Sequence, residues 1–168
     1  VFPAGTQLAA GEYLRVWCDS ETNKPRLHAG FALNAEEESL FLYDGNTTRV
    51  DAVTYGLQLP THSIGRGEAS VAWTLNLPTP GARNEEVALS TNVVFNEVFS
   101  NPIAGGDDWL ELHNLDTNLP AGIGGFYIAV SNQISRLPDL SFISVGGFVQ
   151  ILADENYGAD HLNAKLPA

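Results

Sequence analysis

The stretch Gly11-Glu-Tyr-Leu-Arg-Val-Trp-Cys-Asp19 has a second version, Gly146-Gly-Phe-Val-Gln-Ile-Leu-Ala-Asp154, at an offset of 135 residues (146 minus 11). Glycine matches glycine, aromatic matches aromatic, and apolar residues recur at every second position up to the closing Asp. Further on, His28 aligns with His161 at an offset of 133 (161 minus 28), so the loop between differs by two residues. An apolar residue at every second position indicates a β-strand. The chain is therefore predicted to hold the later part of one module and the earlier part of the next, with strands at 12–19 and 147–154.

The same period of two runs through most of the chain. It is clear at 109–113, where Leu110 and Leu112 alternate with Trp109, Glu111 and His113, and the segment 93–99 is strand-like as well. No amphipathic pattern of ten or more residues predicts a helix. The 16 Gly and 9 Pro suit many turns between short strands. Short strands separated by turns are typical of an all-β sandwich or barrel.

A proline- and glycine-rich segment, 78–86, interrupts the strand pattern. Proline cannot donate to a β-ladder, so a strand is expected to stop there. We predict a first half at 1–86, a linker at 87–92 and a second half at 93–168.

Charge and cysteine usage exclude several classes of protein. The chain carries 20 acidic and 8 basic residues, a net charge of −12, which disfavours nucleic acid and anionic membranes as partners. No apolar run approaches the roughly 20 residues that a membrane-spanning helix needs, so no membrane insertion is expected. Cys18 is the single cysteine, which rules out an internal disulfide. We expect it to act as a small buried apolar residue.

Several motifs resemble the lamin tail domain family, with the two halves of the family pattern in reversed order. The motifs of the family's opening half are Val94-Phe-Asn-Glu-Val98, Asp108-Trp-Leu-Glu-Leu-His-Asn114 and Gly125-Phe-Tyr-Ile128. Those of its closing half come earlier in the chain, at Phe2–Thr6, Gly11–Leu14, Val50–Gly56, Ser63–Arg66, Trp73 and Thr79–Asn84. Together they cover nearly the whole chain.

The resemblance implies an immunoglobulin-like antiparallel β-sandwich. Bacterial members of the family are usually accessory modules of secreted or cell-surface proteins, often repeated or placed beside hydrolase domains, and are taken to bind, anchor or space. The expected localisation is therefore extracellular or at the cell surface. The resemblance also implies structural roles, Trp packing and Glu hydrogen bonding among them, for Asn96, Glu97, Trp109, Glu111 and Asn114.

The reversed order leaves each half with apolar strand faces that the other half should cover. The two halves can close on each other within one chain as a permuted sandwich, or they can pair between chains as a swapped dimer or an open array. In a single closed sandwich, 12–19 and 147–154 would compete for one position. The unused strand would then be an exposed edge that favours self-association.

Two acidic groups are candidate cation sites. Asp154, Glu155, Asn156 and Asp160 surround a glycine turn and offer the oxygen ligands that Ca²⁺ prefers, although they lack the spacing of an EF-hand. The alternative for this loop is a solvated turn.

The other candidate lies at Asp107, Asp108, Glu111 and His113, where Glu111 and His113 would share a strand face about 7 Å apart. The alternative is that this is simply the outer face of a structural strand.

No catalytic motif stands out, and we predict that the protein is not an enzyme. Neither Gly-x-Ser-x-Gly nor His-Glu-x-x-His occurs. Six aromatic residues offer an exposed platform for a glycan or peptide, or else pack within the fold: Tyr13, Trp17, Tyr43, Tyr55, Trp73 and Tyr127. The sequence favours a non-catalytic module for binding, anchoring or spacing, with a protein or glycan partner and no cofactor. The alternatives are a Ca²⁺-stabilised structural repeat and an accessory part of an extracellular hydrolase.

Overall fold

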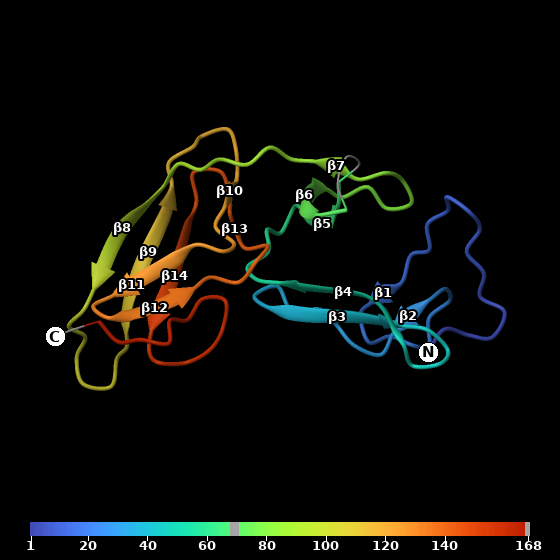
Figure 1. Cartoon of the computed structure of the whole chain (residues 1–168), viewed down its shortest axis with the longest axis horizontal. Helices are drawn as coiled ribbons and strands as arrows, with labels where there is room; N and C mark the ends of the chain where they lie inside the picture. Colours follow the sequence, from blue (N-terminus) through green and yellow to red (C-terminus); the bar gives the residue numbers. More distant parts are fainter. Residues whose placement is uncertain (68–70, 167–168) are drawn as a thin grey trace.

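The computed structural model describes residues 1–67 and 71–166, so the last two residues of the predicted second half lie outside it. Every regular element in these two ranges is a β-strand, which confirms the all-β prediction (Figure 1). They hold no helix long and apolar enough to cross a membrane. The two halves form separate lobes, with the first half at the right of Figure 1 and the second half at the left.

Among the described residues, each half contributes seven strands. Those of the first half are β1 (Trp17–Cys18), β2 (His28–Ala29), β3 (Glu38–Tyr43), β4 (Arg49–Tyr55), β5 (Ser63–Arg66), β6 (Trp73–Leu77) and β7 (Glu85–Glu86). Those of the second half are β8 (Val93–Phe99), β9 (Asp108–Asn114), β10 (Ala121–Gly122), β11 (Tyr127–Val130), β12 (Gln133–Arg136), β13 (Phe142–Ile143) and β14 (Phe148–Ala153).

The second half is built on an antiparallel sheet in the order β14-β9-β8. Leu110 and Leu112 of the central strand β9 point to one face and are buried, as their alternation predicts. Pairs β10-β13 and β11-β12 supply the side chains that cover this face. The buried cluster is drawn from this half alone: Leu110, Leu112, Ala121, Ile123, Ile128, Leu137, Ile143, Ile151, Ala153, Leu162 and Ala164.

Coverage of that sheet is incomplete at its β8 edge. Phe95 and Val98 of β8 lie directly opposite Leu112 and Leu110, so they share the core-facing side of the sheet. Both are nevertheless exposed. The second half therefore covers its sheet on the β14 side and leaves it open on the β8 side.

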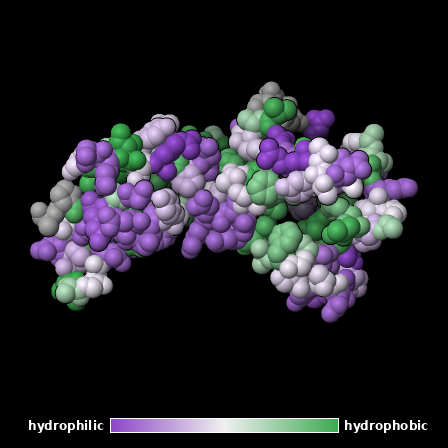
Figure 2. Space-filling view, turned by 60° about the horizontal axis from the view of Figure 1, so that its bottom comes forward, coloured by the Kyte–Doolittle hydropathy of each residue, from purple (hydrophilic) through white to green (hydrophobic). Residues whose placement is uncertain are grey.

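The first half has very little core. Its strands form the hairpin β3-β4, the antiparallel sheet β5-β6-β7 and the short parallel pair β1-β2. Tyr55 and Leu75 are the buried hydrophobic residues described in this half. Hydrophobic side chains of the β3-β4 hairpin, including Phe41, Tyr43 and Val50, stay exposed. Apolar residues accordingly reach the surface of this lobe (Figure 2).

The two halves meet where β4 ends. Gly56 donates its backbone N–H to Asp139 O at 3.0 Å, and Leu57 O accepts the N–H of Phe142 at 3.0 Å. The Leu57 side chain packs against the core of the second half. A Cβ on Gly56 would lie 2.0 Å from Ser141 Oγ, so only glycine permits this approach. The close contact between the halves therefore depends on glycine at position 56.

The predicted linker at 87–92 is bonded to both halves. Val87 donates its N–H to Leu75 O of the first half at 2.9 Å, and Ser90 donates to Pro120 O of the second half at 2.8 Å. Ser90 also forms a parallel bridge with Ala121. The segment thus continues the backbone pairing of β7 into the second lobe.

Candidate functional site

The aligned residues of the sequence repeat form the same Asp–His loop in both halves. His28 Nδ1 lies 2.9 and 3.0 Å from the two carboxylate oxygens of Asp19, and His161 Nδ1 lies 3.0 and 2.9 Å from those of Asp154. Each Asp also accepts a backbone N–H from the second residue after it, at 3.1 Å in both loops. The residue that directly follows the Asp has a positive φ in both, 61° in the first loop and 63° in the second.

Backbone pairing extends the match. Trp17 forms a parallel bridge with His28, and Leu152 forms a parallel bridge with His161. The N–H groups of Trp17 and Leu152 each donate to the residue before the histidine, at 2.8 Å in both cases. The offsets of 135 and 133 residues found in the sequence therefore describe two structural copies. We call residues 11–28 the first repeat and 146–161 the second repeat.

The strands that lead into the two loops differ. In the second repeat, all six residues of β14 pair with β9. In the first repeat only Trp17 and Cys18 form a strand, so the predicted strand at 12–19 is wrong for 12–16. Within the part of the chain that the structure describes, residues 12–16 pair with no strand, while Trp17 and Cys18 pair with β2. Cys18, expected to be buried, is half-buried, and this burial raises the pKa of its thiol.

The carboxylate of the second Asp–His loop is the more enclosed one. The Asp154 side chain is 6% exposed, against 36% for Asp19, whereas His161 is 23% exposed and His28 is 7% exposed. Burial alone would raise the pKa of Asp154, but hydrogen bonds from His161 and Asn156 outweigh it and hold the pKa below its ordinary value. The hydrogen bond to Asp154 in turn raises the pKa of His161. The two groups therefore stabilise each other's charged forms.

The four residues predicted to bind Ca²⁺ surround this second loop. Asp154 bonds to His161 and Asn156, Glu155 lies 3.5 Å from Lys165 Nζ, and Asp160 lies 3.4 Å from His161 Nε2. Across 1–67 and 71–166, no three His, Cys, Asp or Glu side chains are grouped to hold a metal ion. Ca²⁺ binding by the loop stays a prediction.

The second acidic group is spread over strand β9 and the loop before it. Glu111 accepts a hydrogen bond from Asn96 Nδ2 at 2.6 Å, and His113 stacks on Phe148 with ring centroids 4.0 Å apart. Asp107 is exposed and Asp108 begins the strand. Glu111 and His113 are thus engaged with neighbouring strands.

The motif residues that resemble lamin tails have clear structural positions. Asn96 lies at an irregularity between Phe95 and Glu97, where β8 changes register against β9, and its amide reaches Glu111. Trp109 packs against Phe99, with ring centroids 5.6 Å apart.

Asn114 at the end of β9 is fully buried. Its Nδ2 donates to Leu119 O at 2.9 Å and Ser144 O at 3.0 Å, and its Oδ1 accepts the N–H of Asp116 at 3.1 Å. One side chain thereby fixes two loops beside the sheet.

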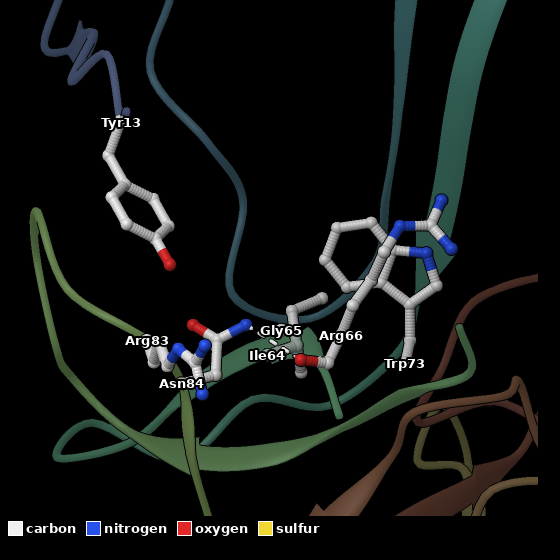
Figure 3. A pocket seen from close by; sticks show the side chains of 7 residues that line it. All are labelled: Tyr13, Ile64, Gly65, Arg66, Trp73, Arg83 and Asn84. Atoms are coloured by element: carbon white, nitrogen blue, oxygen red, sulfur yellow. Dashed lines mark hydrogen bonds between the residues drawn. The ribbon is translucent and has the colours of Figure 1, made fainter. Parts of the chain in front are cut away.

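A shallow hollow in the first half gathers basic and aromatic side chains (Figure 3). Its volume is about 680 Å³. It is lined by Tyr13, Ile64, Gly65, Arg66, Trp73, Arg83 and Asn84. The Tyr13 hydroxyl points across the hollow toward Asn84 (Figure 3). Two of the eight basic residues of a protein with net charge −12 therefore lie in one place.

Two contacts position Arg66 at the edge of this hollow. Its Nη2 donates to Asp51 Oδ1 at 2.6 Å, and its guanidinium carbon lies 4.9 Å from the ring centroid of Trp73. The hydrogen bond from Arg66 holds the pKa of Asp51 below its ordinary value. Asn84 covers Gly65 so closely that a Cβ there would lie 2.5 Å from Asn84 Nδ2.

The six aromatic residues considered as a platform do not come together. Tyr13 and Trp73 share the hollow, while Tyr127 is exposed on the other half. Tyr55 is buried and donates its hydroxyl to Asn34 O at 3.0 Å. Arg66, Arg83 and Asn84 lie in the stretches 63–66 and 79–84, for which the sequence indicated only a family resemblance. Their convergence depends on the pairing of β5 with β6, which places 63–66 beside 73–76.

Comparisons with known proteins give no match: no family model, no curated protein and no solved structure is detectably similar to this chain.

Proposed function

We propose that the protein is a non-catalytic, immunoglobulin-like module of the lamin tail type, from a secreted or cell-surface bacterial protein. It serves binding, anchoring or spacing as one unit of a tandem array. The fold and the motif positions support this proposal, and no step of it depends on a cofactor.

The observation that carries the proposal is the duplicated Asp–His loop. Two loops with the same hydrogen bonds and the same parallel bridge occur in one chain, and each follows a sequence with the same alternating pattern. In an array of identical units, neighbouring units repeat such elements, and the terminal faces are incomplete. The uncovered residues of β8 and the unpaired residues 12–16 are incomplete faces of this kind.

A hydrolysis assay separates this function from the accessory-hydrolase alternative. Extracellular polysaccharides and proteins are incubated with the full chain and with the variants Asp108→Asn and His113→Ala. We expect no turnover above background in any sample. Turnover that both variants lose would contradict the proposal.

The Ca²⁺ alternative has its own test. The melting temperature is measured with excess Ca²⁺ and with chelator, for the full chain and for Asp160→Asn. A ligand that binds the folded state raises its stability by an amount that grows with concentration. We expect the same melting temperature in all conditions, whereas a Ca²⁺-dependent rise that Asp160→Asn removes would favour the alternative.

The hollow around Trp73 supports a second, more specific role, the binding of an anionic glycan or peptide. Arginine recognises carboxylates, and exposed aromatic faces suit sugar rings. A panel of neutral and acidic polysaccharides is tested by affinity electrophoresis against the full chain, Arg83→Gln and Trp73→Ala. Tyr127→Ala is the matched control, because this aromatic residue is exposed on the other half. Retardation by acidic polymers that the first two variants lose and the control keeps is the expected result.

A further inference from the structure

We propose that Asn46, in the turn between β3 and β4, is an attachment site for an N-linked glycan. The segment Asn46-Thr-Thr48 is an Asn-x-Thr sequon, the pattern that is glycosylated in surface loops of secreted proteins. No other asparagine in the sequence has Ser or Thr two residues after it. The inference goes beyond the proposed function and rests on the secreted or cell-surface location proposed there, because N-linked glycans are added to chains that leave the cytosol.

The sequon occupies an accessible turn. Residues 44–48 connect β3 to β4, and all of them are exposed. The far end of β4 contacts the second half through Gly56, so the turn lies at the end of the hairpin that points away from that half (Figure 1). A glycosylating enzyme therefore reaches Asn46 without separating the two halves.

The side chain of Asn46 has no structural role, in contrast to other asparagines of the fold. Asn96 and Asn114 both donate their side-chain amides to other parts of the second half. Asn46 instead uses only its backbone: its N–H donates to Asp44 Oδ1 at 2.8 Å, and its carbonyl oxygen accepts Thr47 Oγ1 at 2.6 Å. Within residues 1–67 and 71–166, neither Nδ2 nor Oδ1 of Asn46 forms a hydrogen bond. The nitrogen that would carry the sugar is therefore unengaged.

Asp44 holds the turn without using the side chains of the sequon. Its Oδ1 accepts the backbone N–H groups of Asn46 and Thr48, both at 2.8 Å, and its own N–H donates to Thr48 O at 2.9 Å. Such bonds from an Asp side chain to nearby backbone groups are typical of tight turns. The Thr48 hydroxyl, the second group that defines the sequon, likewise forms no hydrogen bond in the described part of the chain. Both recognised side chains are thus available to an enzyme.

The modification exchanges one bond at the sugar and needs no redox partner. The donor is an oligosaccharide joined through its anomeric carbon to a polyprenyl diphosphate. Asn46 Nδ2 forms a bond to this carbon and gives up one proton, while the bond from the carbon to the diphosphate oxygen breaks. The lipid diphosphate leaves with the electron pair of that bond, and the product is a glycosylated amide.

A glycan at Asn46 would lie beside an apolar surface that the first half leaves open. Phe41, Tyr43 and Val50 of the hairpin are each more than half exposed. Exposed apolar patches favour association, whereas an N-linked glycan is bulky and solubilising. Because Tyr43 precedes the site by three residues and Val50 follows it by four, the glycan would shield both side chains. We expect it to lower the tendency of the hairpin to self-associate.

Glycosylation of the purified full-length chain in vitro tests the site. The chain is incubated with a bacterial oligosaccharyltransferase and its lipid-linked oligosaccharide donor, and a standard acceptor peptide verifies that the enzyme is active. We expect a mass increase of one oligosaccharide, located at Asn46 by mass spectrometry of the peptides. An active enzyme that leaves the chain unmodified would overturn the proposal.

Matched variants show whether the enzyme reads this sequon. Asn46→Gln should abolish the modification, and so should Thr48→Val, which replaces the hydroxyl by a methyl group and leaves Asn46 intact. Thr48→Ser keeps the hydroxyl and should remain a substrate. Because both positions are exposed, we expect the same circular dichroism spectrum for all the variants. A glycan that persists in Asn46→Gln or in Thr48→Val would overturn the assigned site.

The shielding effect has its own readout. Light scattering at rising concentration compares the glycosylated chain with the unmodified one, and we expect association to begin at a several-fold higher concentration when the glycan is present. Equal onset in the two samples would overturn the shielding. Enzyme and donor are both supplied in these experiments, and the hydrolysis and Ca²⁺ tests above do not involve Asn46. A failure here therefore leaves the proposed non-catalytic module standing.

Discussion

The first and second repeats share a sequence pattern and a loop but differ in what surrounds them. In the second repeat, β14 pairs with β9 along its whole length and Ile151 is fully buried. In the first repeat, the matching Val16 is only half-buried, and two residues of the strand pair with β2. An alternating pattern therefore specifies which face of a strand is apolar, whereas the partner strand determines whether that face becomes a core.

Truncation of the matched core-facing residues should separate the repeats most strongly. Ile151→Ala removes a fully buried side chain and should lower the free energy of unfolding by about 2–5 kcal/mol. Val16→Ala should lower it by less than about 1 kcal/mol, because that site is half-exposed. Urea unfolding followed by far-ultraviolet circular dichroism measures both. Similar losses in the two variants would mean that the first repeat is packed as tightly as the second.

The contact between the halves should be the next most sensitive feature. Gly56→Ala places a methyl group against Ser141 Oγ and Pro138 Cβ and should cost about 1–3 kcal/mol by overpacking. Gly45→Ala is the control, because a Cβ there meets nothing within 4 Å. Limited proteolysis should cut Gly56→Ala faster near residue 56 and leave the control unchanged. Unaltered cleavage in Gly56→Ala would show that the halves dock elsewhere.

The two Asp–His loops should contribute unequally to stability. His161→Gln should lower the free energy of unfolding by about 1–3 kcal/mol near pH 6, because it removes a hydrogen bond to an enclosed carboxylate. The same change at His28 should cost less than about 1 kcal/mol, since Asp19 is more exposed. Parallel urea titrations of the two variants provide the measurement, and a larger loss at His28 would reverse the ranking.

The pH dependence of the second loop follows from its two pKa shifts. The raised pKa of His161 means that its contribution is complete below about pH 6.5, the unfolded value, and is lost as the pH rises through the folded pKa. The lowered pKa of Asp154 means that its contribution is complete above about pH 3.9 and is lost as the pH falls through the folded pKa. The stability difference between wild type and His161→Gln should therefore be largest between these limits. Stability curves from pH 3 to 9 test this, and a difference that grew above pH 8 would contradict it.

Much of the second half could be predicted from the sequence. The alternation around Leu110 and Leu112 correctly identified the buried face of β9, and the repeat correctly located β14. The sequence could not show that residues 12–16 fail to form a strand, because they have the same alternating pattern as β14. The two segments differ in their surroundings: β14 pairs with β9, and residues 12–16 are not described as part of any strand. The Trp73 hollow was not predicted, because it depends on how β5, β6 and the Arg83–Asn84 turn meet in space. The Asp–His hydrogen bonds could not be predicted either, because a strand pattern does not say which side chains of a loop meet. The alignment of His28 with His161 did mark where they lie.

The strand register of the second half also determines how tension would pass through it. The start of β8 lies beside the end of β9 at Asn114, and the end of β14 lies beside the start of β9 at Asp108. Chain entering at Val93 and leaving at Ala153 is therefore attached at opposite ends of the same sheet. A pulling force would load β8, β9 and β14 in shear, so that the ladder hydrogen bonds resist together rather than opening one after another. Such a sheet is suited to hold its length in the array that we propose, while the β3-β4 hairpin, with no comparable core, would extend first.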